Sequence, residues 1–251
     1  MGNPLLDPNA RLVVAHRGNA VRAPENTIDA LREAVDLGAD ALEFDVRMTR
    51  DGVPVLLHDA ELDRTTDRRG RLSDWSLADV QELNAGARFP HRAGAPARIP
   101  SLEEVLDTFR DLPLIIEVKE LAAVDATERL IRRFGAQEHV VVGSLEADVS
   151  ARFYRSGLAC CASVTDAMRL LPVALLGWTP SRPAFQVLSL TPRYYGAPVP
   201  IARMVAAARR AGIATHVWTV NDPAEALRLW EAGVAGILTD DPQAILGARR
   251  R

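Results

Sequence analysis

The amino-acid sequence predicts an α/β fold, a TIM (β/α)8 barrel with a small insertion after a hairpin on the second strand. Eight short apolar segments alternate with helical segments along the 251 residues. Runs such as LIIEV, VVVG and GILT suit strands that are buried on both faces, as in a parallel sheet. The chain length also fits eight βα units. A doubly wound open sheet is the alternative, but no glycine-rich dinucleotide-binding loop follows the first strand.

The eight predicted strands are bounded by turn residues and helical segments. They are Leu12–Ala15, Ala41–Val46, Pro113–Lys119, Val140–Ser144, Leu158–Ser163, Phe185–Leu190, Ala214–Val220 and Ala235–Thr239.

The helices are predicted from apolar stripes and capping residues. The first begins after an N-cap at Asn26 or Thr27 and ends at Gly38, and a capping-box pattern opens the helix over Ser101–Arg110. The others are Leu77–Leu83, Val124–Phe134, Glu146–Ser156, Ala167–Leu176, Ile201–Ala211, Pro223–Glu231 and Pro242–Ala248.

The second strand continues into a β-hairpin over Ala41–Asp59. Asp51-Gly52 suits a two-residue turn, because both central positions require positive φ. With that loop Asp45 lies directly opposite His58, and opposed residues of an antiparallel pair point to the same face. The hairpin therefore predicts that a carboxylate and an imidazole meet on one face.

The segment between Ala60 and Pro100 is irregular apart from its short helix, and it is rich in arginine, glycine and proline. It is too long for a simple connection. We interpret residues 60–100 as an insertion or lid beside the site.

Polar residues collect at the carboxyl ends of the first three strands, where TIM barrels place catalytic groups. His16 and Arg17 follow the first strand. Glu43 and Asp45 share a face of the second strand, because residues two apart in a strand point the same way.

Glu117 and Lys119 share a face of the third strand by the same rule. Three carboxylates around one point repel each other unless a cation lies among them, and oxygen ligands favour Mg²⁺ or Ca²⁺ over zinc. Of the 30 basic residues only Lys119 is a lysine, which suggests a position that needs a compact charge.

Structural roles are the alternative for several of these residues. Glu117 and Lys119 can form a plain interior ion pair, and a single histidine such as His16 or His58 can be a hydrogen-bonded core residue. Trp218 can pack the barrel or form an aromatic wall for a substrate. The remaining histidines are assigned to the surface (His91, His139) and to a structural position (His216).

Composition excludes several classes of function. The net charge is −3 without a basic block, so nucleic-acid binding is not expected. The beginning of the sequence lacks the pattern of a signal peptide, and the longest apolar run, Leu170–Trp178, is short and contains a proline. Cys160 and Cys161 are adjacent on one predicted strand and point to opposite faces, so we expect them to pack in the core without a disulfide between them. We expect a cytoplasmic protein without stable membrane association.

Eight motifs resemble one enzyme family in order and spacing. They are HRG at 16–18, PENT at 24–27, LGADALEFDV at 37–46, DGVPVLLHD at 51–59, LDRTT at 62–66, IIEVK at 115–119, VWTVN at 217–221 and GILTDDP at 236–242. Together they are similar to the glycerophosphodiester phosphodiesterases, over nearly the whole chain.

The resemblance implies a single TIM-barrel domain over residues 1–251 with its insertion after the HD motif. It implies metal-dependent hydrolysis of a glycerophosphodiester to sn-glycerol 3-phosphate and an alcohol, by a monomer or homodimer. The implied roles are metal ligation by Glu43, Asp45 and Glu117, acid/base catalysis by His16 and His58 in unassigned order, phosphate contact by Arg17 and Lys119, and glycerol packing by Trp218.

Two positions depart from the family pattern. Asp241 replaces an arginine that usually follows TD, which would alter a contact at the rim, and Arg22 stands where small or aromatic residues are commoner. Two other functions remain open. A lysophospholipase-D-like enzyme needs an apolar track, which the composition of residues 60–100 disfavours. A silent phosphate-binding barrel would lack one of the two histidines or one of the three carboxylates, and all five are present.

Overall fold

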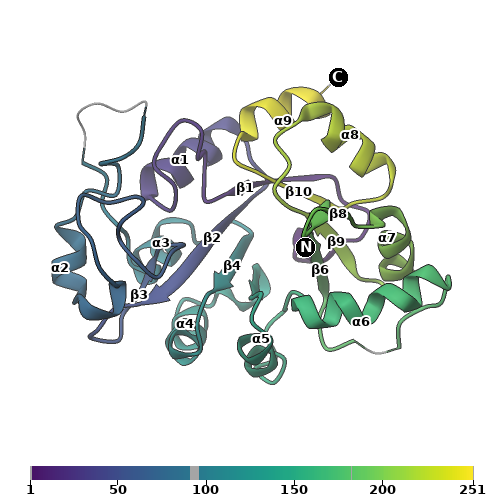
Figure 1. The fold of residues 1–251 in the computed structure, drawn as a ribbon, viewed down its shortest axis with the longest axis horizontal. Coiled ribbons are helices and arrows are strands. Elements are labelled where there is room, and N and C mark those ends of the chain that lie inside the picture. The colour runs from purple at the N-terminus through teal and green to yellow at the C-terminus, as the bar shows by residue number, and fades with distance from the viewer. Residues whose placement is uncertain (1, 91–95, 182, 251) are drawn as a thin grey trace.

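A curved parallel sheet forms the centre of the molecule in the computed structural model, which describes residues 2–90, 96–181 and 183–250. Its strands are β1 (Leu12–His16), β2 (Ala41–Met48), β4 (Leu114–Val118), β5 (Val140–Gly143), β6 (Val187–Leu190), β9 (Ala214–Val217) and β10 (Gly236–Thr239). They lie in the order β5-β4-β2-β1-β10-β9-β6, and every neighbouring pair in this order is parallel. Figure 1 shows the helices arranged around this sheet.

The gap between β5 and β6 is bridged by two residues. Cys160 pairs with Val142 and Cys161 pairs with Val187, both in parallel. The predicted fifth strand, 158–163, is therefore reduced to two bridges, which join the two ends of the sheet. The prediction of a TIM barrel is confirmed.

The predicted helices are present, with ends shifted by a few residues. They are α1 (Ile28–Leu37), α2 (Leu77–Gln81), α3 (Leu102–Thr108), α4 (Leu121–Arg133), α5 (Ala147–Phe153), α6 (Val164–Leu175), α7 (Ile201–Arg210), α8 (Pro223–Glu231) and α9 (Pro242–Arg249). Thr27, not Asn26, is the N-cap of α1. Short 3₁₀ turns at Pro4–Leu6, Leu72–Asp74 and Ala136–Glu138 were not predicted.

The register predicted for the hairpin was wrong by one residue. In the pairing of β2 with β3 (Pro54–Leu56), Val46 lies opposite Leu56. The N–H of Leu57 therefore donates to the carbonyl of Asp45, at 3.2 Å, and His58 lies beyond the end of the strand.

The turn explains the difference. The N–H of Thr49 donates to the carbonyl of Val53 at 3.0 Å, so the loop holds three residues, 50–52. Only Gly52 has positive φ, and the Thr49 hydroxyl donates to the Asp51 carboxylate at 2.6 Å. This is the three-residue hairpin with a glycine in the left-handed region, which competes with the two-residue turn for the same sequence.

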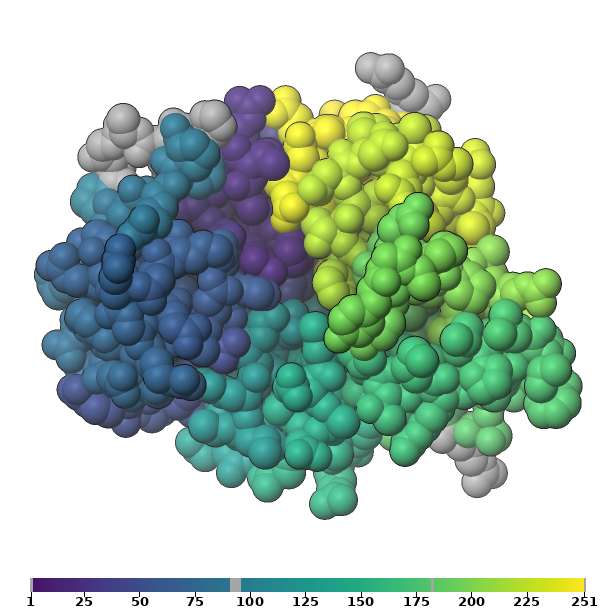
Figure 2. All heavy atoms as spheres, viewed as in Figure 1, coloured from purple at the N-terminus to yellow at the C-terminus, as the bar shows by residue number. Residues whose placement is uncertain are grey.

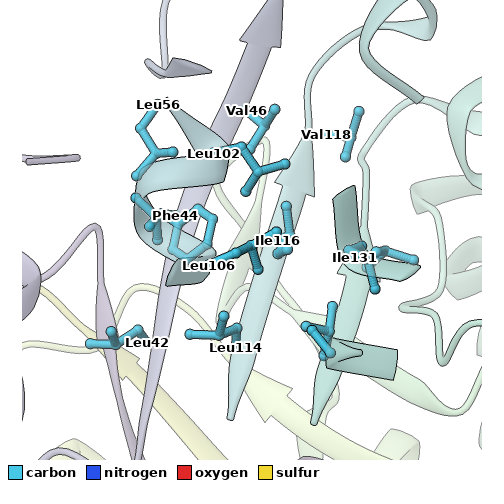
Figure 3. Close-up of a cluster of buried hydrophobic side chains, with 14 of the residues drawn as sticks. Leu42, Phe44, Val46, Leu56, Leu102, Leu106, Leu114, Ile116, Val118 and Ile131 are labelled. Atoms are coloured by element: carbon cyan, nitrogen blue, oxygen red, sulfur yellow. The ribbon is translucent and has the colours of Figure 1, made fainter. Parts of the chain in front are cut away.

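Alternating side chains of the strands face two different environments. Figure 3 shows side chains of β2 and β4 that point out of the barrel toward α3, and their neighbours in sequence point inward. The outward set in the figure is Leu42, Phe44, Val46, Leu114, Ile116 and Val118. Inside the barrel a second apolar cluster includes Leu12, Val14, Ala41, Ile115, Val141, Val187 and Leu238. These residues fill the barrel below the carboxyl ends of the strands.

Two further segments flank the carboxyl ends of the strands. The described part of residues 60–100 has its own apolar cluster with β3, which includes Leu62, Leu72, Val80 and Ile99, and this blue region forms one side of the molecule in Figure 2. An unpredicted two-stranded hairpin, β7 (Arg193–Tyr194) and β8 (Ala197–Pro198), follows β6. Within the described residues, no helix is both long and apolar enough for a transmembrane span.

Candidate active site

A cavity of about 370 Å³ opens at the carboxyl ends of the barrel strands. Seven of the eight site residues predicted from the sequence line it, and the eighth, Asp45, is buried. The lining set is His16, Arg17, Glu43, His58, Glu117, Lys119 and Trp218. The structure therefore brings together all the residues that the sequence placed at strand ends.

Asp45 is the most buried charged group of the site. Its two carboxylate oxygens lie 2.8 Å from Lys119 Nζ and 2.9 Å from Arg17 Nε. Burial opposes ionisation, but the charges of Lys119 and Arg17 outweigh it and lower the pKa of Asp45 to about 2. The Asn26 amide donates to the same carboxylate at 2.9 Å. Asp45 is therefore a carboxylate at neutral pH.

Lys119 connects two of the acids. Its Nζ lies 2.7 Å from Glu117 Oε1 as well as 2.8 Å from Asp45 Oδ1, and its side chain is 10% exposed. The interior ion pair considered as a structural alternative is thus present. It lies in the wall of the cavity, so it does not exclude contact with a substrate.

Glu43, Asp45 and Glu117 form a group whose carboxylate oxygens lie within 4.8 Å of one another. Burial is the main cause that raises the pKa of Glu43 to about 7, and the charges of Asp45 and Glu117 add to it. Lys119 Nζ lies 2.8 Å from Asp45 Oδ1 and 2.7 Å from Glu117 Oε1, so one cationic side chain already lies among these acids. An all-oxygen donor set of three carboxylates fits a hard divalent cation. This cluster can hold a metal ion.

His16 is held by carboxylates on both sides. Its Nδ1 lies 2.7 Å from Asp240 Oδ1, and its Nε2 lies 3.8 Å from Glu43 Oε2. Burial lowers the pKa of His16, but Glu43 and the hydrogen bond with Asp240 together raise it above the usual value. Asn221 donates to the other oxygen of Asp240 at 2.9 Å and so orients that carboxylate.

His58 has a similar partner. Its Nδ1 lies 2.7 Å from Asp59 Oδ1, and Arg64 Nε donates to the second oxygen of Asp59 at 2.5 Å. Arg64 also donates twice to Glu25, at 2.7 and 2.8 Å. In both histidines the carboxylate engages Nδ1, which leaves Nε2 as the ring nitrogen available for proton transfer.

The turn after β1 is held in an unusual conformation. Arg17 has φ of 57° and Gly18 has φ of 88°. A Cβ at Gly18 would lie 2.5 Å from the carbonyl carbon of Ala30, so only glycine allows α1 to approach this closely. Asn26 also has positive φ, at 58°, which asparagine tolerates better than most residues. The backbone therefore accounts for the glycine of HRG and the asparagine of PENT.

The other residues singled out in the sequence lie as follows. His216 is buried and does not line the cavity. Burial lowers the pKa of His216 to about 4, so its imidazole is neutral at neutral pH. His139 is partly buried just before β5, and His91 lies outside the described residues. Asp241 is the N-cap of α9, since its side chain accepts from Ala244 N at 3.0 Å, and Arg22 is exposed.

Sequence reasoning did not assign the residues that support the histidines. Asp240, Asn221 and Asp59 lie within or next to motifs that carry the family resemblance. Asp240 follows β10 directly, so the strand-end rule used for the first three strands would have identified it. The pairing of Asp240 with His16 joins residues that are 224 positions apart.

A match to a family model decides to which family the chain belongs. Residues 16–244 match the model of the glycerophosphoryl diester phosphodiesterase family. The chain belongs to this family. That range spans the whole site, from His16 to beyond Asp240.

Two curated relatives have similar length and carry the name of an activity. A protein named glycerophosphodiester phosphodiesterase from Caldanaerobacter subterraneus is 30% identical over 96% of this chain and 98% of its own. A Bacillus subtilis protein of the same name is 32% identical over 95% of this chain and 86% of its own.

Solved structures of the family have the same fold. The glycerophosphoryl diester phosphodiesterase domain of a Mycobacterium tuberculosis protein superposes with a TM-score of 0.83 at 25% identity, over 96% of this chain and 99% of that one. An Oleispira antarctica phosphodiesterase, solved in complex with the product sn-glycerol-3-phosphate, gives a TM-score of 0.77 at 26% identity, over 96% and 97% of the two chains. This chain is therefore a member of an enzyme family whose fold it shares over 96% of its length.

Proposed function

We propose that this protein hydrolyses glycerophosphodiesters to sn-glycerol 3-phosphate and an alcohol, with a divalent cation. One observation carries the proposal: a three-carboxylate group, two carboxylate-supported histidines and two cationic side chains share one cavity. The names of the relatives and the product complex of the Oleispira antarctica enzyme support it.

Glu43, Asp45 and Glu117 are the residues that would hold the cation, and their oxygen-only donor set favours Mg²⁺ or Ca²⁺. When bound, such an ion supplies charge neutralisation and Lewis acidity at the phosphate oxygens. With the cation present, the charge repulsion that helps to raise the pKa of Glu43 is relieved.

His16 and His58 exchange protons with the substrate through Nε2. One removes the proton from the attacking hydroxyl, and the other protonates the oxygen of the leaving alcohol. In the family resemblance the attacking group is the neighbouring hydroxyl of the glycerol. Asp240 and Asp59 keep the imidazole rings in the tautomer with the proton on Nδ1, so that Nε2 faces the reaction.

Arg17 and Lys119 line the cavity beside the acids and contribute positive charge where negative charge develops on the phosphoryl group. Trp218 lines the same cavity and offers an aromatic surface for the glycerol. The side chains of Arg17 and Lys119 both pair with Asp45, so their positions are set before the substrate binds.

We further propose that the described part of residues 60–100 is an insertion that supports the rim of the site, within a single domain. Arg64 of this segment pairs with Glu25, in the loop after β1, and with Asp59, the partner of His58.

The test measures release of glycerol 3-phosphate from glycerophosphocholine. The protein is assayed after EDTA treatment, and then with added Mg²⁺ or Ca²⁺. We expect activity only with metal, and a loss of at least about 10²-fold in His58→Ala, because general acid–base catalysis contributes about 10²–10⁴-fold.

The matched control is His139→Ala, which changes a histidine outside the cavity and should keep full activity. Activity that is indifferent to EDTA would contradict the metal proposal. A folded protein that releases no glycerol 3-phosphate with any metal would favour a phosphate-binding barrel without catalysis.

A further inference from the structure

His58 lies where the strand no longer fixes its direction. β3 ends at Leu56, and the N–H of Leu57 still donates to the carbonyl of Asp45, one residue before the histidine. The His58 side chain is 34% exposed, so burial alone does not hold the ring. A misplacement of about 1 Å in a catalytic group can cost about 10²-fold in rate. Other contacts must therefore orient this imidazole.

Two arginines provide these contacts, one at the backbone and one at the ring. Arg47 Nε donates to the carbonyl of His58 at 2.7 Å. His58 Nδ1 lies 2.7 Å from one oxygen of Asp59, and Arg64 Nε donates to the other oxygen at 2.5 Å. Burial opposes ionisation of Asp59, but the hydrogen bonds with Arg64 and His58 outweigh it and lower the pKa of Asp59. The ring therefore has a carboxylate as its partner, and Arg64 fixes that carboxylate.

Arg64 is itself anchored on Glu25. Its two terminal nitrogens donate to the two oxygens of this carboxylate, at 2.7 and 2.8 Å. Arg17 holds Glu25 from the other side, because its Nη1 donates to Glu25 Oε1 at 3.1 Å. Burial raises the pKa of Glu25, but Arg64 and Arg17 outweigh this and lower it. The anchor is thus a carboxylate that belongs to the loop after β1.

The guanidinium group suits this double contact. Its donors form a rigid planar fork, so one side chain can fix two carboxylates relative to each other. Arg64 does not line the cavity, whereas His58 does. Any effect of Arg64 on the reaction must therefore pass through the carboxylates that it holds.

We propose that Arg64 is a positioning residue of the reaction: anchored on Glu25, it holds Asp59 and through it sets the imidazole of His58. This inference rests on the proposed phosphodiesterase function. It gives the insertion a part in proton transfer, beyond its support of the rim. The competing explanation is that Arg64 only ties the insertion to the barrel and contributes stability.

The first test compares variants in the hydrolysis of glycerophosphocholine by the metal-supplemented protein. We expect kcat/KM of Arg64→Met to fall about tenfold, since His58 keeps its ring but loses its fixed partner. The Arg64 side chain is 47% exposed, so the fold should be retained. Arg64→Lys should recover only part of the loss, because one ammonium group cannot bridge both carboxylates. Full recovery in Arg64→Lys would overturn the role of the planar fork.

Arg69→Met is the matched control. Arg69 belongs to the same segment, but it pairs with Asp63 at 3.8 Å and its side chain is 82% exposed. This variant should keep the wild-type kcat/KM. A loss equal to that of Arg64→Met would show that any arginine of the segment has this effect, and would overturn the assignment to Arg64.

A double-mutant cycle with His58→Ala separates positioning from stability. If Arg64 acts through the imidazole, the loss caused by Arg64→Met should shrink from about tenfold to about twofold or less once the imidazole is absent. A coupling of this size is typical of residues in one hydrogen-bond network. Equal losses in the two backgrounds would overturn the proposal, because a purely stabilising residue does not need His58.

NMR of the histidine rings follows the contact without turnover. The sequence has five histidines, and the ring signal of His58 is the one that disappears in His58→Ala. We expect this signal to shift or broaden in Arg64→Met and to match the wild type in Arg69→Met. A His58 signal that is unmoved in Arg64→Met would overturn the proposal.

The outcomes distinguish this inference from the proposed function. Hydrolysis by the wild type with an unaffected Arg64→Met enzyme would overturn the positioning role and leave the phosphodiesterase function in place. No hydrolysis by the folded wild type with any metal, together with a His58 signal that moves in Arg64→Met, would overturn the phosphodiesterase function while the hold on His58 stands.

Discussion

Replacing Lys119 with methionine tests how the acid cluster is held together. The ammonium group lies 2.8 Å from Asp45 and 2.7 Å from Glu117, and the Asp45 side chain is fully buried. Removing one partner of a buried ion pair costs about 3–5 kcal/mol. Arg17 and Asn26 still contact Asp45, so we expect the lower end, about 3 kcal/mol. For a protein of this size that corresponds to a fall in Tm of about 6–12 °C.

The assay is urea unfolding of wild type and Lys119→Met in EDTA, with the free energies compared at equal m-values. Arg133→Met is the control, because Arg133 pairs with Glu103 at 3.0 Å but its side chain is 65% exposed. An exposed pair contributes about 0–1 kcal/mol. Equal losses in the two variants would refute the conclusion that Lys119 neutralises the buried acids.

Added Mg²⁺ or Ca²⁺ provides a second measurement on the same variant. Lys119 brings positive charge to two of the three proposed metal ligands, so its removal should increase the stabilisation that the cation provides. We expect a larger rise in Tm on metal addition for Lys119→Met than for wild type. A smaller rise would mean that Lys119 supports the metal site and does not compete with it.

Three further predictions follow from the site and the core. Asp240→Asn removes the hydrogen-bonded charge that helps to raise the pKa of His16. The limb of the pH–kcat/KM profile that reports His16 should therefore move to lower pH, and the rate should fall about 10²-fold. An unmoved profile would argue against the pairing of Asp240 with His16. Gly18→Ala should destabilise the protein by about 2 kcal/mol or more, because φ is positive and the new Cβ meets the Ala30 backbone; thermal unfolding at the wild-type Tm would contradict this. Leu106→Ala, in the layer between α3 and the sheet, should cost about 2–5 kcal/mol in urea unfolding without changing KM, and a change in KM would show that the layer positions the site.

Much of the fold was predictable because local pattern and tertiary burial agree. In β2 and β4 the strand period places Leu42 and Ile116 toward the helices and Glu43 and Glu117 toward the barrel interior, so pattern alone predicted which side chains would meet. The same strand-end reasoning applied to β10 would have added Asp240.

The β2–β3 register was not predictable from the same reasoning. Asp51-Gly52 is compatible with a two-residue and a three-residue loop, and the choice depends on the hydrogen bonds of Thr49 with Val53 and Asp51. His58 still reaches the cavity because it lies past the end of β3, where the pairing no longer determines which way it points.

The sequence by itself determined the alternation of strands and helices, the acids and histidines of the site, and the family, because these depend on short-range spacing and on residue type. Only the tertiary structure decided how the cavity is completed. The apolar part of its lining combines side chains of α6, the β7–β8 hairpin and α7. None of these segments has a distinctive pattern alone, because an apolar wall is defined by what packs around the same space and not by the order of residues along the chain.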